Sequence, residues 1–438
     1  MKLDNKRTIF VGFAFMAICA FWQVYDGIIP LILKNTFGIN DVLSGGVMAV
    51  DNILALVLLP LFGTLSDRTN SKIGRRMPYI IGGSLSAAAI TILLPLANQI
   101  RSFALFVIAL GAVLLAMATW RSPAVALMPD VTPKPLRSKG NAIINLMGTV
   151  GGILALVAIG VLVPAGENPS YWPIFIFISV FMAVCLLVLL KTTNEPELVE
   201  KMKKESAAMM GVEDDIEERA EEAMTPAVKK SFIFILASIF LWFMGYNAVI
   251  TAFSKYANVY WGLEGGAYAY TLIVAQAAAA VSYIPVGMIA TKIGRRKTIL
   301  TGIVLLAAAF GSAAFFKSFT AMMFAFFSLA GIGWAAINVN SYPMVVEMSK
   351  GADVGKYTGY YYTVSMIAQI ITPIFSGALL EYGYKILGSA DVNGGYVLLF
   401  PYGAVFVALS FLTMLFVHHG DAKAVKKVSA LEHFDFDD

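Results

Sequence analysis

The sequence is short of charged residues, cysteine and histidine. Asp, Glu, Lys and Arg make up 14% of its 438 residues, whereas an ordinary soluble domain has about 25%. The two cysteines, Cys19 and Cys185, lie in separate apolar runs and offer neither a disulfide framework nor a metal cluster. All three histidines lie between residues 418 and 433. These shortages exclude a water-soluble multidomain enzyme and argue against metal-based or histidine-based catalysis.

Long apolar runs take the place of the missing charge. Hydrophobic residues make up 58% of the chain, and a helix that crosses a bilayer needs about 20 residues. The runs cannot be open strands, because hydrocarbon leaves strand edges unsatisfied, and they lack the alternation of a membrane barrel. We therefore predict an all-α polytopic membrane protein with twelve transmembrane helices. They fall at about residues 8–33, 42–65, 78–97, 103–128, 140–163, 172–190, 230–252, 266–290, 299–316, 320–346, 357–380 and 396–417.

Basic residues predict the orientation of these spans. Of the 32 Lys and Arg residues, 26 fall on one side of the predicted membrane, five fall on the other and Arg121 lies inside a span. Because cytoplasmic loops carry the excess of basic residues, both termini are predicted to be cytoplasmic in the cell membrane. The first apolar run follows basic residues as in a signal peptide, but it is too long and lacks a cleavage site, so we predict a retained span. The net charge of +4 therefore reflects topology and does not indicate a nucleic-acid partner.

A repeat and a change of composition divide the chain. Gly74-Arg75-Arg76 recurs as Gly294-Arg295-Arg296, and Ser122-Pro123 recurs as Tyr342-Pro343, both 220 residues later. Transporters are often built from such repeats. Between the two halves, a charge-rich segment predicts a solvated or surface-lying helical linker. We predict an N-terminal six-helix bundle (1–190), a cytoplasmic linker (191–229), a C-terminal six-helix bundle (230–417) and a cytoplasmic tail (418–438).

The first cytoplasmic hairpin carries a recognisable motif. It reads Gly63-Thr-Leu-Ser-Asp67-Arg68 and, after a short insertion, Gly74-Arg75-Arg76. A tight basic turn joins two closely packed helices here: the glycines permit close approach, and the acid pairs with an arginine or caps a helix. This pattern resembles the loop signature of the major facilitator superfamily. It repeats more weakly in the second half, where Thr291 replaces the acid.

Longer runs resemble one branch of that superfamily. The loop SDRTNSKIGRRMPYIIGG, the helix-four run WRSPAVALMPD and the first-helix run FWQVYDGIIPLIL are similar to the glycoside–pentoside–hexuronide cation symporters, and most similar to the branch with the plant sucrose transporters. The resemblance implies proton-coupled uptake of a disaccharide or related glucoside by a functional monomer, with no bound cofactor. Melibiose-type members carry two acids one turn apart in helix two, whereas Asp51 stands alone here, which favours a proton over sodium as the coupling ion.

Three ionisable residues lie well inside the spans: Asp26, Asp51 and Arg121. Charges within hydrocarbon are costly and usually functional. Arginine stays protonated and neutralises one carboxylate, so the other is left to bind a proton when shielded from water. We assign proton coupling to these three residues. Two alternatives stay open here: Asp26 and Asp51 form an outer gate with Lys34 or Lys255, and Arg121 snorkels or pairs with Asp130.

Sugar binding calls for carboxylates and amides that meet hydroxyls and for aromatic faces that meet C–H surfaces. Polar and aromatic residues within the spans provide such groups, although helix-to-helix hydrogen bonding is an alternative role for each amide. The predicted substrate-binding residues are Trp22, Gln23, Asp26, Trp120, Arg121, Asn141, Asn145, Tyr246, Asn247, Gln276, Asn338 and Tyr361.

Charged residues also lie at the cytoplasmic helix ends. In the superfamily that the chain resembles, such charges latch the inner gate, so we predict a gate made of Asp67, Arg75, Asp130, Arg295 and Glu347. The alternatives are simple capping and topology, or local pairs of Asp130 with Arg137 and of Glu347 with Lys356.

Together these patterns predict a secondary transporter of a small sugar that works by alternating access between two bundles. They contain no nucleotide-binding loop and no nucleophile-base pair, so the protein is not expected to be an enzyme. One alternative is a proton-coupled exporter of amphipathic compounds. The other is a non-transporting membrane sensor.

Overall fold

The computed structural model describes residues 4–133, 136–166, 169–210, 225–348 and 354–420, and these residues form helices with no strand among them. Twelve helical segments in the described part are long and apolar enough to cross a membrane, so the predicted all-helical membrane fold is confirmed. The elements are α1 (Asn5–Leu31), η1 (Ile32–Thr36), α2 (Asp41–Arg68), α3 (Met77–Thr91), α4 (Leu93–Gln99), α5 (Phe103–Asp130), α6 (Arg137–Leu162), α7 (Trp172–Thr192), α8 (Glu195–Met210), α9 (Pro226–Val259), α10 (Ala269–Ile293), α11 (Arg295–Ala313), α12 (Met322–Glu347), α13 (Val354–Ile386), η3 (Val392–Leu398) and α14 (Leu399–Met414).

Short polar side chains begin several of the long helices. Asp4 accepts a hydrogen bond from the backbone N–H of Arg7, and Asn40 accepts one from that of Leu43, which satisfies donors that a helix start leaves free. Ser102 and Thr225 do the same for α5 and α9. The sequence therefore sets these helix starts locally, just outside each apolar run.

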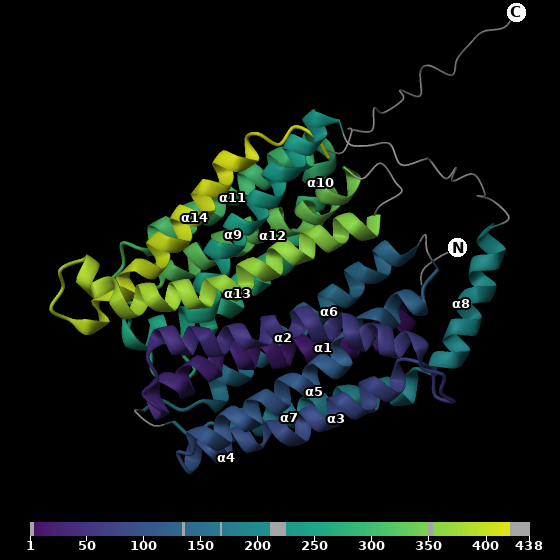
Figure 1. The fold of residues 1–438 in the computed structure, drawn as a ribbon, viewed down its shortest axis with the longest axis horizontal. Helices are drawn as coiled ribbons and strands as arrows, with labels where there is room; N and C mark the ends of the chain where they lie inside the picture. The colour runs from purple at the N-terminus through teal and green to yellow at the C-terminus, as the bar shows by residue number, and fades with distance from the viewer. Residues whose placement is uncertain (1–3, 134–135, 167–168, 211–224, 349–353, 421–438) are drawn as a thin grey trace, which may run out of the picture.

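The spanning helices form two bundles (Figure 1). In the N-terminal bundle α1 packs against α6 and α7, and α3 packs against α5 and α7. In the C-terminal bundle α12 packs against α10 and α11, and α9 packs against α13 and α14. The two bundles meet where α2 packs against α13, α6 against α10 and α1 against α9. Any site between the bundles is therefore lined by residues that are far apart in the chain.

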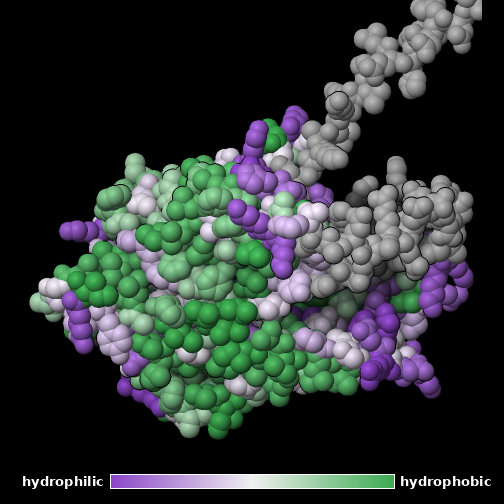
Figure 2. Space-filling view, turned by 45° about the horizontal axis from the view of Figure 1, so that its top comes forward, coloured by the Kyte–Doolittle hydropathy of each residue, from purple (hydrophilic) through white to green (hydrophobic). Residues whose placement is uncertain are grey.

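The outer surface of the molecule is apolar around its middle. Figure 2 shows a broad hydrophobic surface with hydrophilic residues gathered at its two ends. Large apolar side chains such as Ile108, Val161, Val281 and Ile284 are 69–77% exposed. In water such a surface would be unfavourable, whereas against lipid tails it is not. The chain is a multi-pass membrane protein.

The helix α8 lies at one end of the molecule, beside the start of α1 (Figure 1). We call this the α8 end and the opposite one the far end. Glu205 of α8 pairs with Arg7 at 3.2 Å, and Lys201 lies 3.7 Å from Asp4. Within the predicted linker, α8 is thus held against the N-terminal bundle, and residues 226–229 already belong to α9, while residues 211–224 lie outside the described part.

Glu195 fixes the start of α8 to the start of α3. Its carboxylate is 2% exposed and accepts hydrogen bonds from the backbone N–H groups of Arg75, Arg76 and Met77, at 2.9–3.1 Å. Gly74 has φ of +109°, and a Cβ there would collide with this carboxylate. Glu195 therefore supplies the cap that α3 lacks in its own sequence.

We predict that Glu195→Ala destabilises the protein by about 1–3 kcal/mol, because three buried N–H groups lose their acceptor. Thermal unfolding of the detergent-solubilised protein measures the effect. Glu200→Ala is the matched control, because Glu200 lies on the same helix in an exposed pair with Lys204 that contributes little. Equal melting temperatures for both variants would contradict the capping role.

Candidate transport site

The two bundles are joined at the far end by a buried ionic network centred on Asp41. Its carboxylate is 2.7 Å from Lys255 Nζ of the other bundle, and both side chains are at most 5% exposed. Tyr396 donates to Asp41 at 2.8 Å, Lys34 lies 3.2 Å away, and the Asp41 backbone N–H donates to Glu381 at 2.8 Å. Two acids and two lysines thus balance their charges where α2 meets α9 and α13.

This network corrects one alternative from the sequence. Lys34 and Lys255 were candidate partners of Asp26 or Asp51 in an outer gate, but both lysines pair with Asp41. Asp41 stands in the first turn of α2, where an acid is common because it favours the helix dipole. Its position in the sequence is that of an ordinary first-turn acid, and only the packing of the bundles shows its partner.

Close backbone contacts accompany the network. A Cβ added at Gly45 would collide with the carbonyl of Pro373, and one at Gly377 with the carbonyl of Asp41. A Cβ at Gly266 would likewise collide with the carbonyl of Ile159, and the Gly266 N–H donates to the Val163 carbonyl at 3.1 Å. Glycine thus lets α2 approach α13, and the chain before α10 approach α6. The far end is closed in this conformation.

The buried charges predicted for coupling gather between the bundles. Asp26 of α1, Asp51 of α2 and Arg121 of α5 act on one another electrostatically. Arg121 lies over the ring of Trp22, 5.2 Å from its centroid, and Asp51 accepts a hydrogen bond from Asn52 at 2.8 Å. Among the described residues no partner forms an ion pair or hydrogen bond with the Asp26 carboxyl within the usual limits, and Arg121 forms no ion pair within 4.0 Å. Arg121 therefore contacts an aromatic ring of the site, and the predicted alternative of pairing with Asp130 is wrong, since Asp130 pairs elsewhere.

The C-terminal bundle meets this group with amides and rings. Gln276 of α10 donates to Gln23 of α1 across the boundary. Asp26 and Tyr283 of α10 lie close enough to Tyr246 of α9 to act on it electrostatically. The Tyr246 ring stacks on Trp334 of α12, with centroids 3.6 Å apart. No sequence pattern selects Trp334 or Tyr283, because each is one aromatic ring among many in the apolar spans.

Other predicted binding residues lie elsewhere. Trp120 is 1% exposed and packs inside the N-terminal bundle against Gly83 of α3. Tyr361 is 5% exposed and contacts Ser341 of α12 at 3.2 Å, within the C-terminal bundle. Asn141 and Asn145 lie on an exposed face of α6, where Asn145 donates to the Asn141 carbonyl. Within the described residues, no hydrogen bond or ion pair joins these four side chains to Asp26 or Arg121.

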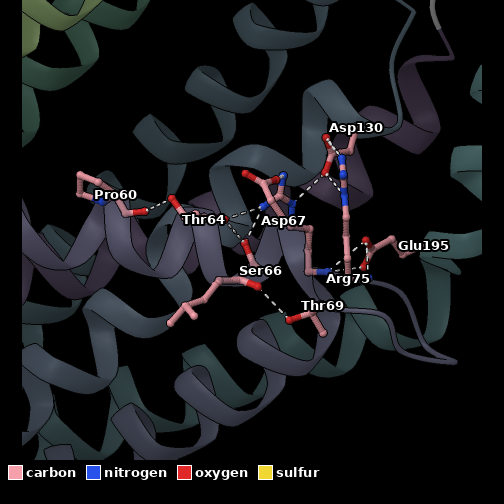
Figure 3. Close-up of polar contacts among 11 residues, drawn as sticks. Pro60, Thr64, Ser66, Asp67, Thr69, Arg75, Asp130 and Glu195 are labelled. Atoms are coloured by element: carbon pink, nitrogen blue, oxygen red, sulfur yellow. Dashed lines mark hydrogen bonds and ion pairs between the residues drawn. The ribbon is translucent and has the colours of Figure 1, made fainter.

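The loop motif forms a second ionic cluster at the α8 end (Figure 3). Arg76 is 4% exposed and donates to Asp130 at 2.8 Å, to Ser66 and to the Gly63 carbonyl, and it pairs with Asp67. Arg75 pairs with Asp130 at 2.7 Å, but 41% of its side chain is exposed. The buried centre of the cluster is Arg76, which the predicted gate set omitted in favour of Arg75.

The repeated motif makes a simpler cluster in the C-terminal bundle. Arg295 pairs with Glu347, and Arg296 donates to the Leu415 carbonyl at the end of α14. The predicted gate residues thus pair within their own bundles in this conformation. The side chains of Arg137 and Lys356, considered as alternative partners, lie outside the described residues.

Two membrane-embedded helical bundles around a central polar site define a membrane transporter rather than an enzyme. The sequence matches the model of the Major Facilitator Superfamily over residues 11–281 and 260–434. The chain belongs to this superfamily, and the resemblance drawn from the loop motif is confirmed.

Three curated relatives match part of the chain. The sucrose transport protein SUC3 of Arabidopsis thaliana is 25% identical over 230 residues, which cover 43% of this chain and 37% of that protein. The uncharacterized symporter sll1374 of Synechocystis is 29% identical over 196 residues, 41% and 36% of the two chains. The alpha-ketoglutarate permease of Escherichia coli is 25% identical over 190 residues, 42% of each. The matches thus span about two fifths of the length of these relatives.

Solved structures match along almost the whole chain. A bacterial homologue of the human lysosomal transporter Spinster, in an inward-facing conformation, has a TM-score of 0.63 at 17% identity, covering 94% of this chain and 93% of that one. A bacterial homologue of the peptide transporters PepT1 and PepT2 has a TM-score of 0.67 at 13% identity, covering 95% and 98%. At such identities the likeness concerns the fold alone.

We predict that Asp41→Asn and Lys255→Met each destabilise the closed far end by about 3–5 kcal/mol, because each leaves a buried charge without its partner. The double variant should destabilise the closed far end by less than the sum of the two single effects, because it leaves no unpaired charge of this pair. Spin-label distances between cysteines placed at Ile100 and Leu387, exposed positions in different bundles, measure the opening. Lys34→Met is the control with a smaller expected effect, since the Lys34 side chain is 26% exposed. Unchanged distances in both single variants would contradict this role.

We also predict unequal effects of the two neighbouring arginines. Arg76→Ala should lower the free energy of unfolding by about 1.5–3 kcal/mol, because a buried group loses several charge-assisted hydrogen bonds. Arg75→Ala should cost at most about 1 kcal/mol, because its pair is half exposed. Thermal unfolding in detergent measures both, and a larger loss for Arg75→Ala would show that the cluster is assigned wrongly.

Proposed function

We propose that this protein is a proton-coupled symporter of a disaccharide or related glucoside that works by alternating access. The observation that carries the proposal is the Asp26 carboxyl at the boundary of the bundles. This carboxyl has no ion-pair partner among the described residues. It lies beside the Arg121 guanidinium, which is over the Trp22 ring, and beside the hydrogen-bonded amides of Gln23 and Gln276.

The charge balance of the site supports a proton as the coupling ion. Asp26 and Asp51 face a single permanent cation, Arg121. When both ends of the site are closed to water, an uncompensated carboxylate is unfavourable in a medium of low dielectric constant. Protonation of one aspartate then removes the excess charge. Asp26 and Asp51 are both candidates for this role, and sodium is the less favoured ion.

The chemistry of the lining supports a sugar as the substrate. Gln23, Gln276 and Asn247 offer amides for hydroxyl groups, while Trp22 and Trp334 offer rings for C–H surfaces. Partial similarity to a protein named as a sucrose transporter points the same way. The lining residues come from both bundles, so a bound sugar would hold the bundles together during occlusion.

The predicted orientation assigns a state to this conformation. With the α8 end in the cytoplasm, the closed far end faces outward and the transporter faces inward, as a functional monomer in the cell membrane. Transport then requires the Asp41–Lys255 contact to open once in each cycle. Asp67, Arg75, Asp130, Arg295 and Glu347 remain the predicted inner gate, re-pairing across the bundles when the α8 end closes.

The test is proton uptake by proteoliposomes or a weakly buffered cell suspension on addition of sucrose, maltose or trehalose. We expect the medium to become more alkaline with at least one sugar, without a need for sodium. Sugar uptake should fall as external pH rises, because fewer carriers bind the proton. Asp26→Asn or Asp51→Asn should abolish the alkalinisation, and the variant that does so identifies the proton-binding acid. Glu264→Gln, at an exposed acid outside the site, should leave the alkalinisation unchanged.

Other outcomes would replace the proposal. Alkalinisation with α-ketoglutarate and with no sugar would assign Arg121 to a carboxylate substrate, as the name of one relative indicates for that relative. Proton-driven efflux of an amphipathic dye that Asp26→Asn abolishes would identify an exporter. No sugar-dependent proton movement with any glucoside would refute proton–sugar symport.

A further inference from the structure

In the transport site, the Tyr246 ring covers one face of the Trp334 indole in an unfavourable stacking geometry. Tyr246 lies on it with planes 2° from parallel and centroids 3.6 Å apart. Aromatic pairs prefer offset or edge-to-face geometry at about 4.5–7 Å, because two stacked quadrupoles repel. Phe243, which precedes Tyr246 on α9, meets the same indole edge-on at 5.5 Å. Phe243 thus meets Trp334 in a preferred geometry, while Tyr246 covers the indole face with little electrostatic gain.

Tyr246 lies near the boundary of the bundles, close enough to Asp26 of the opposite bundle for that carboxyl to act on it electrostatically. Both Tyr246 and Trp334 are only partly buried. A tyrosine ring turns about two side-chain bonds and moves without a change in the backbone. Its removal would expose an indole face toward Asp26.

Unpartnered polar atoms lie on α1, α9 and α10, three helices that pack at the boundary of the bundles. Trp22 Nε1, Asn247 Nδ2 and Gln276 Oε1 are buried and have no hydrogen-bond partner within the described residues. The first two are donors and the third is an acceptor, and leaving such groups unsatisfied is unfavourable. A hydroxyl both donates and accepts, so a polyhydroxylated ligand suits all three.

We propose that Trp334 is the stacking subsite for one pyranose ring of the substrate, and that Tyr246 covers this subsite until the sugar displaces it. This inference rests on the proposed sugar transport and adds that the site recognises the flat ring of the sugar. The flat C–H face of a pyranose carries no quadrupole that opposes the indole, so it replaces the phenol ring favourably. A linear polyol such as mannitol has the same hydroxyl groups but no flat face, and it is excluded.

The test is equilibrium binding of sucrose, maltose, trehalose and mannitol to the purified full-length protein by calorimetry. Trp334→Leu should weaken binding of the sugar about tenfold, and Tyr246→Ala should tighten it about threefold, because the cover is gone. Trp334→Phe, which keeps a smaller ring, should fall between wild type and Trp334→Leu and serves if Trp334→Leu does not fold. Trp172→Phe is the matched control, since that indole bonds Gln99 outside the site and should leave binding unchanged.

The opposite signs of the two effects distinguish a cover from a structural pair, which would make both variants weaker. If the wild type binds a disaccharide, unchanged binding in both Trp334 variants, or weaker binding in Tyr246→Ala, overturns the subsite and leaves the proposed function standing. Mannitol binding as tightly as the disaccharide also overturns it. A wild type that binds none of the sugars refutes the proposed function and this inference with it.

Discussion

The ion pair between Asp41 and Lys255 is the interaction on which this conformation depends. Two buried charges are unfavourable in a protein interior unless their geometry and added hydrogen bonds offset the lost hydration. Tyr396, Lys34 and Ser44 supply those bonds. Because the pair joins different bundles, its satisfaction requires that the far ends meet. The position of the two bundles and the closure of the far end follow from this contact together with the glycine seams.

The α8 end is organised differently. There Arg76 and Glu195 tie α2, α3, α5 and α8 into one body, and Arg295 with Glu347 ties the second bundle. Ion pairs within a bundle make that bundle rigid. Ion pairs across the bundles stabilise one arrangement of the two bundles relative to each other. A transporter that moves by rocking needs both kinds, and this chain places them at opposite ends.

The centre of the molecule keeps its polar groups incompletely paired. Asp26 has no ion-pair partner among the described residues, and Trp22, Asn247 and Gln276 each have an unpartnered polar atom there. Such groups are unfavourable when unpaired, and the far-end network and the ordered bundles hold them in place. Under the proposed function, the hydroxyl groups of a bound sugar would supply their partners.

The sequence by itself determined the twelve spans, the loop motif and the buried charges, because hydrophobicity over about 20 residues and charge within a span are local constraints. Only the tertiary structure decided which of these charges pair. Asp41, Glu195 and Trp334 are not among the predicted site residues, because each lacks a local pattern that marks it. Their partners stand 214, 120 and 88 residues away along the chain. No local pattern encodes such pairings, since they arise only when packed helices bring distant side chains together.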